Sequence, residues 1–153
     1  MSCFALFRLP YQQQVTLVMQ TSGEPLEVSS CMELSGKTGF VVAPFAPSSE
    51  RPILVIRPDV VTHEIPWDEL QEMPHHVSPS VHTDPRMDYH IDFANFHAHL
   101  ENHDFAKLVL SRSIFIPADS TVSPITLYQR ACASYPRMMI MLVSTSRSGM
   151  WLV

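Results

Sequence analysis

The distribution of proline is the feature that most constrains how this chain can fold. There are 13 prolines and only 4 glycines among 153 residues. Proline fixes φ and has no backbone N–H, so long helices and central strands cannot run through it. We therefore expect short elements joined by stiff connections. Hydrophobic residues make up 46% of the sequence, enough for a packed core.

The scarcity of glycine excludes two common nucleotide-binding motifs. The four glycines are too scattered to form the fingerprint of a dinucleotide-binding turn. The triplet Gly36-Lys37-Thr38 resembles the end of a phosphate-binding loop, but Cys31 stands where that loop needs its first glycine. Nucleotide binding is therefore not expected.

Charge is divided unevenly along the chain, whose formal net charge is -5. Residues 1–104 hold 14 acidic and 5 basic residues, whereas residues 105–153 hold 5 basic residues and one acidic residue. The positive segment could attract a small anion, or another part of the protein or a partner could neutralise it. Nucleic acid is not an expected partner, because the basic residues are few and are not interleaved with aromatic ones.

The sequence also indicates in which cellular compartment the protein is expected. It has no apolar run of about 18 residues, and residues 1–10 are too short and contain an arginine, so neither a membrane span nor a signal peptide is expected. Cys3, Cys31 and Cys132 are odd in number and scattered, which favours reduced thiols. We therefore expect a cytoplasmic protein. Cys132 is interpreted as a small core residue of a helix over 125–135 rather than as a catalytic thiol.

The first half of the chain is punctuated like a set of strands. Short apolar runs bounded by Pro, Gly or Ser predict an antiparallel meander. Its strands are expected at 4–9, 15–20, 40–45 and 53–57. A Pro- and His-rich connection follows over 58–86, with one short turn at 67–72, as either a linker or a mobile loop. The expected organisation is thus N-terminal strands over 1–57, this connection, and the start of a catalytic core over 87–153.

The second half combines helices and strands. Tyr89, Phe93, Phe96 and Leu100 recur with helical spacing and predict a helix from Asp88 to about 102–104. A strand over 105–116, a helix over 125–135, and strands at 138–144 and from 149 are predicted to follow. The expected fold class is α+β, an antiparallel-rich sheet with packed helices.

Two histidines on the predicted helix have the spacing of metal ligands. His99 and His103 are four residues apart, and His97 is close by. No glutamate follows His99 as in a zinc-protease motif, and no third ligand is fixed by the sequence. We interpret them as surface histidines, and His75, His76 and His82 as polar residues of the connection.

Lys107 is the residue most able to carry chemistry. In a strand over 105–116, alternation places it on one face with Val109, Ser111 and Ser113. Desolvation of a lysine lowers its pKa and suits it to general-base catalysis. The alternative is a lysine at the first residue of the strand that still reaches water.

The segment 104–112, DFAKLVLSR, resembles the helix-following strand of the chorismate-utilising enzymes, which carries a Lys-Val-Val-Leu-(Ala/Ser)-Arg pattern. The helix over 124–135, the turn at 136–138 and the strand at 149–153 follow in that family's order. The opening FALFRLP, with LVMQ at 17–20 and GFVVAPF at 39–45, resembles the start of the isochorismate synthases of menaquinone biosynthesis. The resemblance implies the anthranilate synthase-like fold, of which this chain would be an N-terminal portion.

The resemblance also implies a reaction and a role for Lys107. Family members that add water to chorismate carry lysine at this position as the base that activates the water, whereas anthranilate synthases typically carry glutamine. The implied activity is an isomerase reaction that converts chorismate to isochorismate. Mg²⁺ would hold the substrate carboxylate, and a glutamate would act as general acid.

Most of the implied catalytic groups do not lie in this sequence. The glutamate that acts as general acid in the family belongs to a Ser/Thr-Pro-Glu motif, which follows the strand that begins at Gly149. The magnesium ligands come later still in the family's sequence. We therefore expect the 153-residue chain alone to be inactive, to hold no specific Mg²⁺ site, and to self-associate through open strand edges. The alternatives are a salicylate or anthranilate synthase-type relative and a non-catalytic binding module.

Overall fold

The computed structural model describes residues 3–72, 85–111 and 123–153, and the chain divides into two units. In its described residues, the larger unit, residues 1–78 and 120–153, contains two antiparallel sheets, two α-helices and a short 3-10 helix. The described part of the smaller unit, residues 79–119, contains one helix. The α+β class predicted from the sequence is therefore confirmed. In the described part of the chain, no helix is both long and apolar enough to cross a membrane.

The first sheet has five strands in the order β6-β2-β1-β7-β8. Its members are β1 (Cys3–Arg8), β2 (Val15–Gln20), β6 (Val60–Thr62), β7 (Ile140–Thr145) and β8 (Gly149–Leu152). Every pairing is antiparallel, with Leu6 opposite both Leu17 on β2 and Leu142 on β7. β1 therefore lies at the centre of the sheet, and its residues build the core on both faces.

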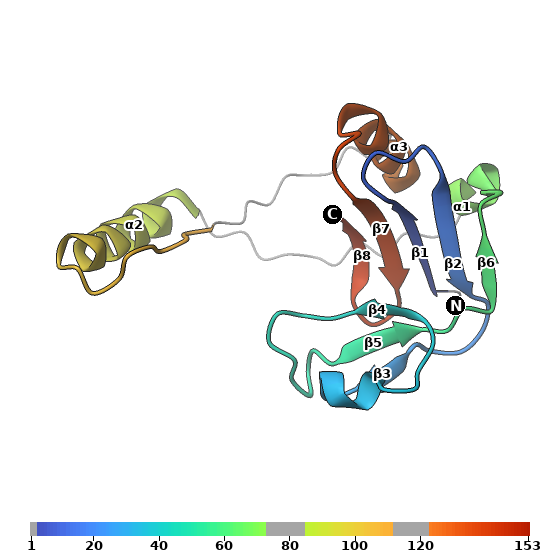
Figure 1. Cartoon of the computed structure of the whole chain (residues 1–153), viewed down its shortest axis with the longest axis horizontal. Coiled ribbons are helices and arrows are strands. Elements are labelled where there is room, and N and C mark those ends of the chain that lie inside the picture. The colour runs from blue at the N-terminus through green and yellow to red at the C-terminus, as the bar shows by residue number, and fades with distance from the viewer. Residues whose placement is uncertain (1–2, 73–84, 112–122) are drawn as a thin grey trace. The chain divides into compact units, whose positions relative to one another are not determined.

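Two helices cover one face of this sheet (Figure 1). They are α1 (Trp67–Glu72) and α3 (Pro124–Ser134). Phe4 and Leu6 of β1 point to this side and pack with Leu70 of α1 and with Ile125 and Tyr128 of α3. α3 begins where the sequence predicts, because Ser123 caps it by accepting a hydrogen bond from the Thr126 N–H at 3.2 Å, and proline occupies its first turn.

The second sheet lies across one end of the larger sheet, on its other face (Figure 1). It has the order β3-β5-β4, with β3 (Leu26–Val28), β4 (Phe40–Val42) and β5 (Ile53–Ile56), and a short 3-10 helix, η1 (Cys31–Leu34), follows β3. Cys3 and Ala5 of β1, which alternate with the helix-facing residues, pack here with Ile56 and Val143. The ring centroids of Phe7 and Phe40 are 5.7 Å apart.

The predicted single meander is therefore wrong. All four predicted strands exist, but β1 and β2 belong to one sheet and β4 and β5 to the other. The sequence prediction also missed β3 and β6, each three residues long. β6 falls inside the predicted connection, just before the turn at 67–72, which is the helix α1. Short edge strands carry too few residues to show alternation, which explains why they were missed.

Two buried polar side chains fix the ends of the central strands. Arg8 donates four hydrogen bonds to backbone carbonyls, two of them to Tyr135 at 2.7 Å and Pro136 at 3.1 Å in the turn between α3 and β7. The others reach Gln12 and Met138. Gln20 donates to the carbonyls of Ser22 and Glu24 and accepts from the Arg57 N–H. These bonds join segments that are far apart in the sequence, because each buried side chain reaches backbone groups of a neighbouring turn.

Cysteine placement agrees with reduced thiols. Cys3, Cys31 and Cys132 are all free. Cys132 is half-buried against the cluster beneath α3, as expected of a small core residue. Burial raises the pKa of the neighbouring Tyr128 hydroxyl, and the Cys132 thiol adds to the shift.

The smaller unit holds α2 (Pro85–Glu101), the helix predicted from residue 88. The strand predicted over 105–116 is wrong for the part that is described, because residues 105–111 form no strand; residues 112–116 lie outside the described part. A strand needs a hydrogen-bonded partner, and none of the described strands pairs with residues 105–111. His75, His76 and His82 also lie outside the described residues.

Candidate functional site

Lys107 lies in the extended segment that follows α2, and its side chain is exposed. Its neighbours Phe105 and Val109 are also exposed, by 53% and 75%. Lys107 forms no ion pair among residues 3–72, 85–111 and 123–153, and it does not line the cleft between the two sheets of the larger unit. The structure thus places this lysine in contact with water, the alternative considered for it, and brings no other catalytic group of the described chain to it.

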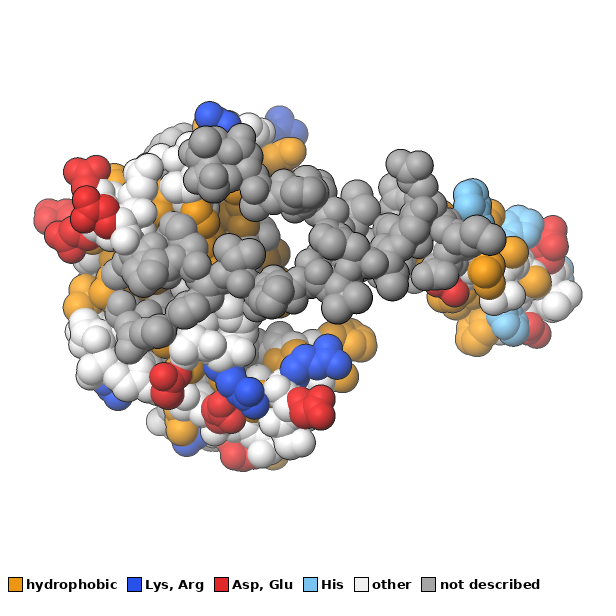
Figure 2. All heavy atoms as spheres, turned by 180° about the vertical axis from the view of Figure 1, so that it is seen from behind, with side chains coloured by type: hydrophobic (Ala, Val, Ile, Leu, Met, Phe, Trp, Pro, Cys, Tyr) orange, Lys and Arg blue, Asp and Glu red, His pale blue; other side chains and the backbone are white. Residues whose placement is uncertain are grey.

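His99 lies in the last turn of α2, and His103 lies just beyond the end of that helix. His103 has a φ of 60° and donates from its N–H to the Leu100 carbonyl, while the Asp104 N–H reaches the His99 carbonyl at 3.1 Å. These two bonds form a Schellman motif, with His103 as its left-handed residue. His99 Nδ1 lies 2.9 Å from Asp104 Oδ2. Figure 2 shows histidine and hydrophobic side chains together on the surface of this unit.

Magnesium, implied by the family resemblance, finds no suitable ligand set in the described residues. Nowhere in this part of the chain do three His, Cys, Asp or Glu side chains converge on one point. Mg²⁺ prefers several oxygen ligands in octahedral geometry. The described residues therefore do not fit this ion.

A cleft of about 740 Å³ lies where the two sheets meet. Leu54 of β5 and Val143 of β7 form its floor and are almost fully buried. Phe40 and Val42 of β4 and Met141 of β7 are half-buried around them. The cleft is shaped by strands rather than by loops, so its apolar surface is held in place by the sheet pairing.

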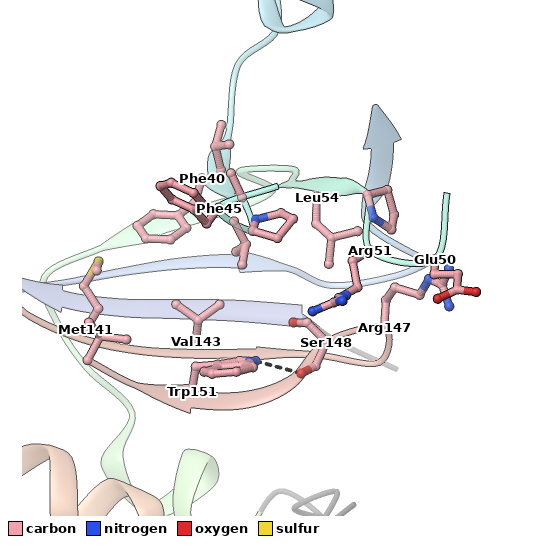
Figure 3. A pocket seen from close by; sticks show the side chains of 16 residues that line it. Phe40, Phe45, Glu50, Arg51, Leu54, Met141, Val143, Arg147, Ser148 and Trp151 are labelled. Atoms are coloured by element: carbon pink, nitrogen blue, oxygen red, sulfur yellow. Dashed lines mark hydrogen bonds between the residues drawn. The ribbon is translucent and has the colours of Figure 1, made fainter. Parts of the chain in front are cut away.

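The rim of the cleft carries exposed aromatic side chains. Phe45 follows β4 and is fully exposed, and Trp151 of β8 is 57% exposed. The indole N–H of Trp151 donates to the Ser148 carbonyl at 2.7 Å, the dashed bond in Figure 3. This bond fixes the indole ring along one wall. Large exposed aromatic side chains beside a buried apolar floor are typical of a binding surface.

Charged residues gather at one end of the cleft. Figure 3 shows Arg51, Arg147 and Glu50 there, opposite the end formed by Phe40 and Met141. Arg147 donates to Glu27 Oε1 at 3.1 Å and to the Ser49 carbonyl at 3.4 Å. Arg51 forms no ion pair among the described residues. The arrangement can therefore hold a molecule with an apolar body and one polar end.

Glycine at position 39 allows β4 to lie close to β5. A Cβ at Gly39 would collide with the backbone carbonyl oxygen of Ile56 and would lie 2.8 Å from a methyl group of Val55. No side chain fits without moving β4. The wall formed by Phe40 and Val42 thus depends on this glycine.

Sequence reasoning did not find the cleft. It predicted the strands that carry Phe40 and Trp151, but it left Arg51 in an unassigned loop. The one available signal was the pair of exposed aromatics near strand ends, Phe45 and Trp151, and sequence alone does not show that they are exposed. Comparison of the chain with protein-family models, with curated proteins and with solved structures gave no match.

Proposed function

We propose that this chain supplies part of a chorismate-utilising enzyme of the isochorismate synthase type, with Lys107 as its general base. The observation that carries the proposal is the motif KLVLSR at 107–112, preceded by a helix. The helix α3 and the strands β7 and β8 then follow the motif in the order the resemblance implies.

Lys107 would take a proton from water as the water oxygen bonds to C2 of the chorismate ring. The C4–oxygen bond breaks, and the departing hydroxyl takes a proton from a general acid. That acid is implied to be a glutamate that follows β8 in the family and is not among the 153 residues. Lysine at position 107 favours water over ammonia as the nucleophile, which distinguishes this proposal from an anthranilate synthase.

Lys107 is exposed, and a general base at this position must be shielded from water. A lysine acts as a base only when its neutral form is populated, and removal of water favours that form. Lys107 must therefore become enclosed, by substrate and by protein groups that the described residues do not provide. The 153-residue chain alone is accordingly expected to show no turnover of chorismate.

The decisive test is to read the gene past the codon for Val153 and assay the product of the whole reading frame. We expect a Ser/Thr-Pro-Glu motif shortly after β8, and formation of isochorismate from chorismate with Mg²⁺ present. Lys107→Ala should lower kcat by about 10²–10⁴-fold, the usual contribution of a general base. Lys37→Ala is the matched control, because Lys37 is the chain's other lysine and is also exposed.

Three results would contradict this proposal. One is turnover by the 153-residue chain alone, and another is full activity of Lys107→Ala in the whole product. The third is a reading frame that stops at Val153 with no isochorismate formed under any of these conditions. An equal loss of activity in Lys37→Ala would show that replacing either lysine damages the protein in general. The lower kcat of Lys107→Ala would then not be evidence for a general base.

A further inference from the structure

The cleft between the sheets has the size and lining of a ligand site. Its volume of about 740 Å³ falls within the roughly 300–1,000 Å³ of small-molecule sites. Its floor and walls are apolar from Met141 and Phe40 to Leu54, and charged side chains occur at one end only. Such a lining matches a molecule with a long apolar body and a single polar group at one end.

The charge at that end determines the sign of the polar group. Arg147 is already paired with Glu27, and its second hydrogen bond holds it to the Ser49 carbonyl. Arg51 has no ion pair in the described part of the chain, and Figure 3 shows its guanidinium pointing toward the Trp151 side of the cleft. Glu50 lies at the outer end in the same view. The free guanidinium next to the apolar walls is therefore that of Arg51, which favours an anion.

The geometry of the guanidinium further limits the kind of anionic group that can bind. The fork of N–H donors in arginine matches the two oxygens of a carboxylate. A doubly charged head group would meet Glu50 as well as the single unpaired arginine, whereas one carboxylate balances Arg51 alone. We propose that the cleft binds an apolar monocarboxylate of the fatty-acid class, with its carboxylate on Arg51 and its chain between Phe40, Val143 and Trp151. This site does not involve Lys107 and is independent of the proposed synthase reaction.

Trp151 provides the readout for a binding experiment with the 153-residue chain. The chain has two tryptophans, and Trp67 packs in the core beside Tyr128, with ring centroids 6.4 Å apart. In a Trp67→Phe background, decanoate should therefore shift or quench the fluorescence of Trp151 alone. Octanoate should bind about 15-fold more weakly than decanoate, because it is two methylenes shorter and each buried methylene contributes about fourfold in affinity.

Two variants test the polar end. Arg51→Gln should weaken decanoate binding by about tenfold or more, because a charge-assisted hydrogen bond is lost. Glu50→Gln should strengthen it slightly, because a like charge is removed. Arg130→Gln is the matched control: Arg130 is exposed on α3, outside the residues that line the cleft, so decanoate affinity should not change.

Several results would overturn the proposal. Decanol or decylamine binding as tightly as decanoate would show that the carboxylate is not recognised. An unchanged decanoate affinity in Arg51→Gln would show that Arg51 does not bind the carboxylate. Absence of saturable binding by decanoate would also reject it. Sedimentation of the ligand-free chain supplies the last check, because dimers that form together with a change in Trp151 fluorescence would show that a second copy covers the cleft.

Discussion

The six-residue helix α1 of the larger unit and the 17-residue helix α2 of the smaller unit differ in how far their side chains are buried. α1 buries Leu70 completely against the sheet, whereas no described side chain of α2, residues 89–101, is buried. Even the predicted apolar stripe of α2 stays half-buried or exposed, with Phe93 at 52%. Length and apolar spacing thus do not determine whether a helix joins a core.

The two helices are held by different interactions. α2 relies on local contacts, such as the stacked rings of Tyr89 and Phe93, the His97–Glu101 pair at 3.5 Å, and the Schellman motif at its end. Local pairs of this kind contribute about 0.2–0.5 kcal/mol each. α1 and α3 instead bury side chains in a common core, each contributing about 1.5–3 kcal/mol. The larger unit should therefore be much more stable than α2.

The largest effect is expected at the buried cation of the larger unit. Arg8→Met would remove four hydrogen bonds from a charged donor, although the carbonyls of Tyr135 and Pro136 each keep a backbone N–H donor. Because bonds to a charged group are the strong ones, we expect a loss of about 3–5 kcal/mol in the free energy of unfolding. Urea denaturation followed by circular dichroism measures it. Arg130→Met, on the exposed side of α3, should change stability by only about 0.5 kcal/mol. A loss below about 1 kcal/mol in Arg8→Met would show that water replaces the guanidinium.

Matched truncations in the two helices test the comparison directly. Leu70→Ala should lower the free energy of unfolding by about 3 kcal/mol, because it leaves a cavity beneath α1. Phe93→Ala removes a larger side chain from α2 but should cost less than about 1 kcal/mol. Equal losses would mean that Phe93 is buried in solution and that α2 packs on a core.

Hydrogen exchange measures the same difference without substitutions. Amides of β1 and β7, at the centre of the larger sheet, should exchange only through global or near-global unfolding. Amides of α2 should exchange orders of magnitude faster, because its opening exposes little apolar surface. Comparable protection in the two units would contradict the distinction drawn from burial.

Much of the larger unit could be predicted from the sequence because its local signals agree with its packing. β2, β8 and α3 were predicted within one residue at their boundaries, and each contributes apolar residues that pack in the core or against it, such as Leu17, Met150 and Ile125. The run at 105–116 has an equally strong apolar pattern, but a strand also requires a partner strand, and none of the described strands pairs with residues 105–111. Strand pairing joins segments that are far apart in the sequence, such as β1 and β7, and the local pattern does not encode it.

The candidate site was harder to predict for the same reason. Arg51 and Trp151 line one cleft although 100 residues separate them, because β5 and β7 bring their neighbours together. Lys107 was chosen because its residue type and surrounding motif carry chemistry, which requires no knowledge of long-range pairing. Motifs therefore indicated the proposed catalytic residue, and only the fold indicated the cleft.

The smallest effect expected concerns Asp59, which forms an ion pair with Arg57 in the turn before β6 and a hydrogen-bonded link to Thr21 at the end of β2. Asp59 accepts hydrogen bonds from Arg57 and from the N–H and hydroxyl of Thr21. The Arg57 hydrogen bond is the main reason that the pKa of Asp59 lies well below its usual value, followed by the Thr21 N–H. A carboxyl with a lowered pKa in the folded state stabilises the protein above its ordinary pKa of about 3.9 and loses that contribution as the pH falls further.

Asp59→Asn should therefore be slightly less stable than the wild type at pH 7, and the difference should shrink as the pH falls from about 4 toward 2. It should also shrink in 1 M salt, which screens exposed pairs. Urea titrations at each pH measure this difference. Glu64→Gln is the control, an exposed carboxylate with no ion pair in the described part of the chain, and it should show no such trend. A difference that stayed constant from pH 7 to pH 2 would mean that Asp59 acts by shape rather than by charge.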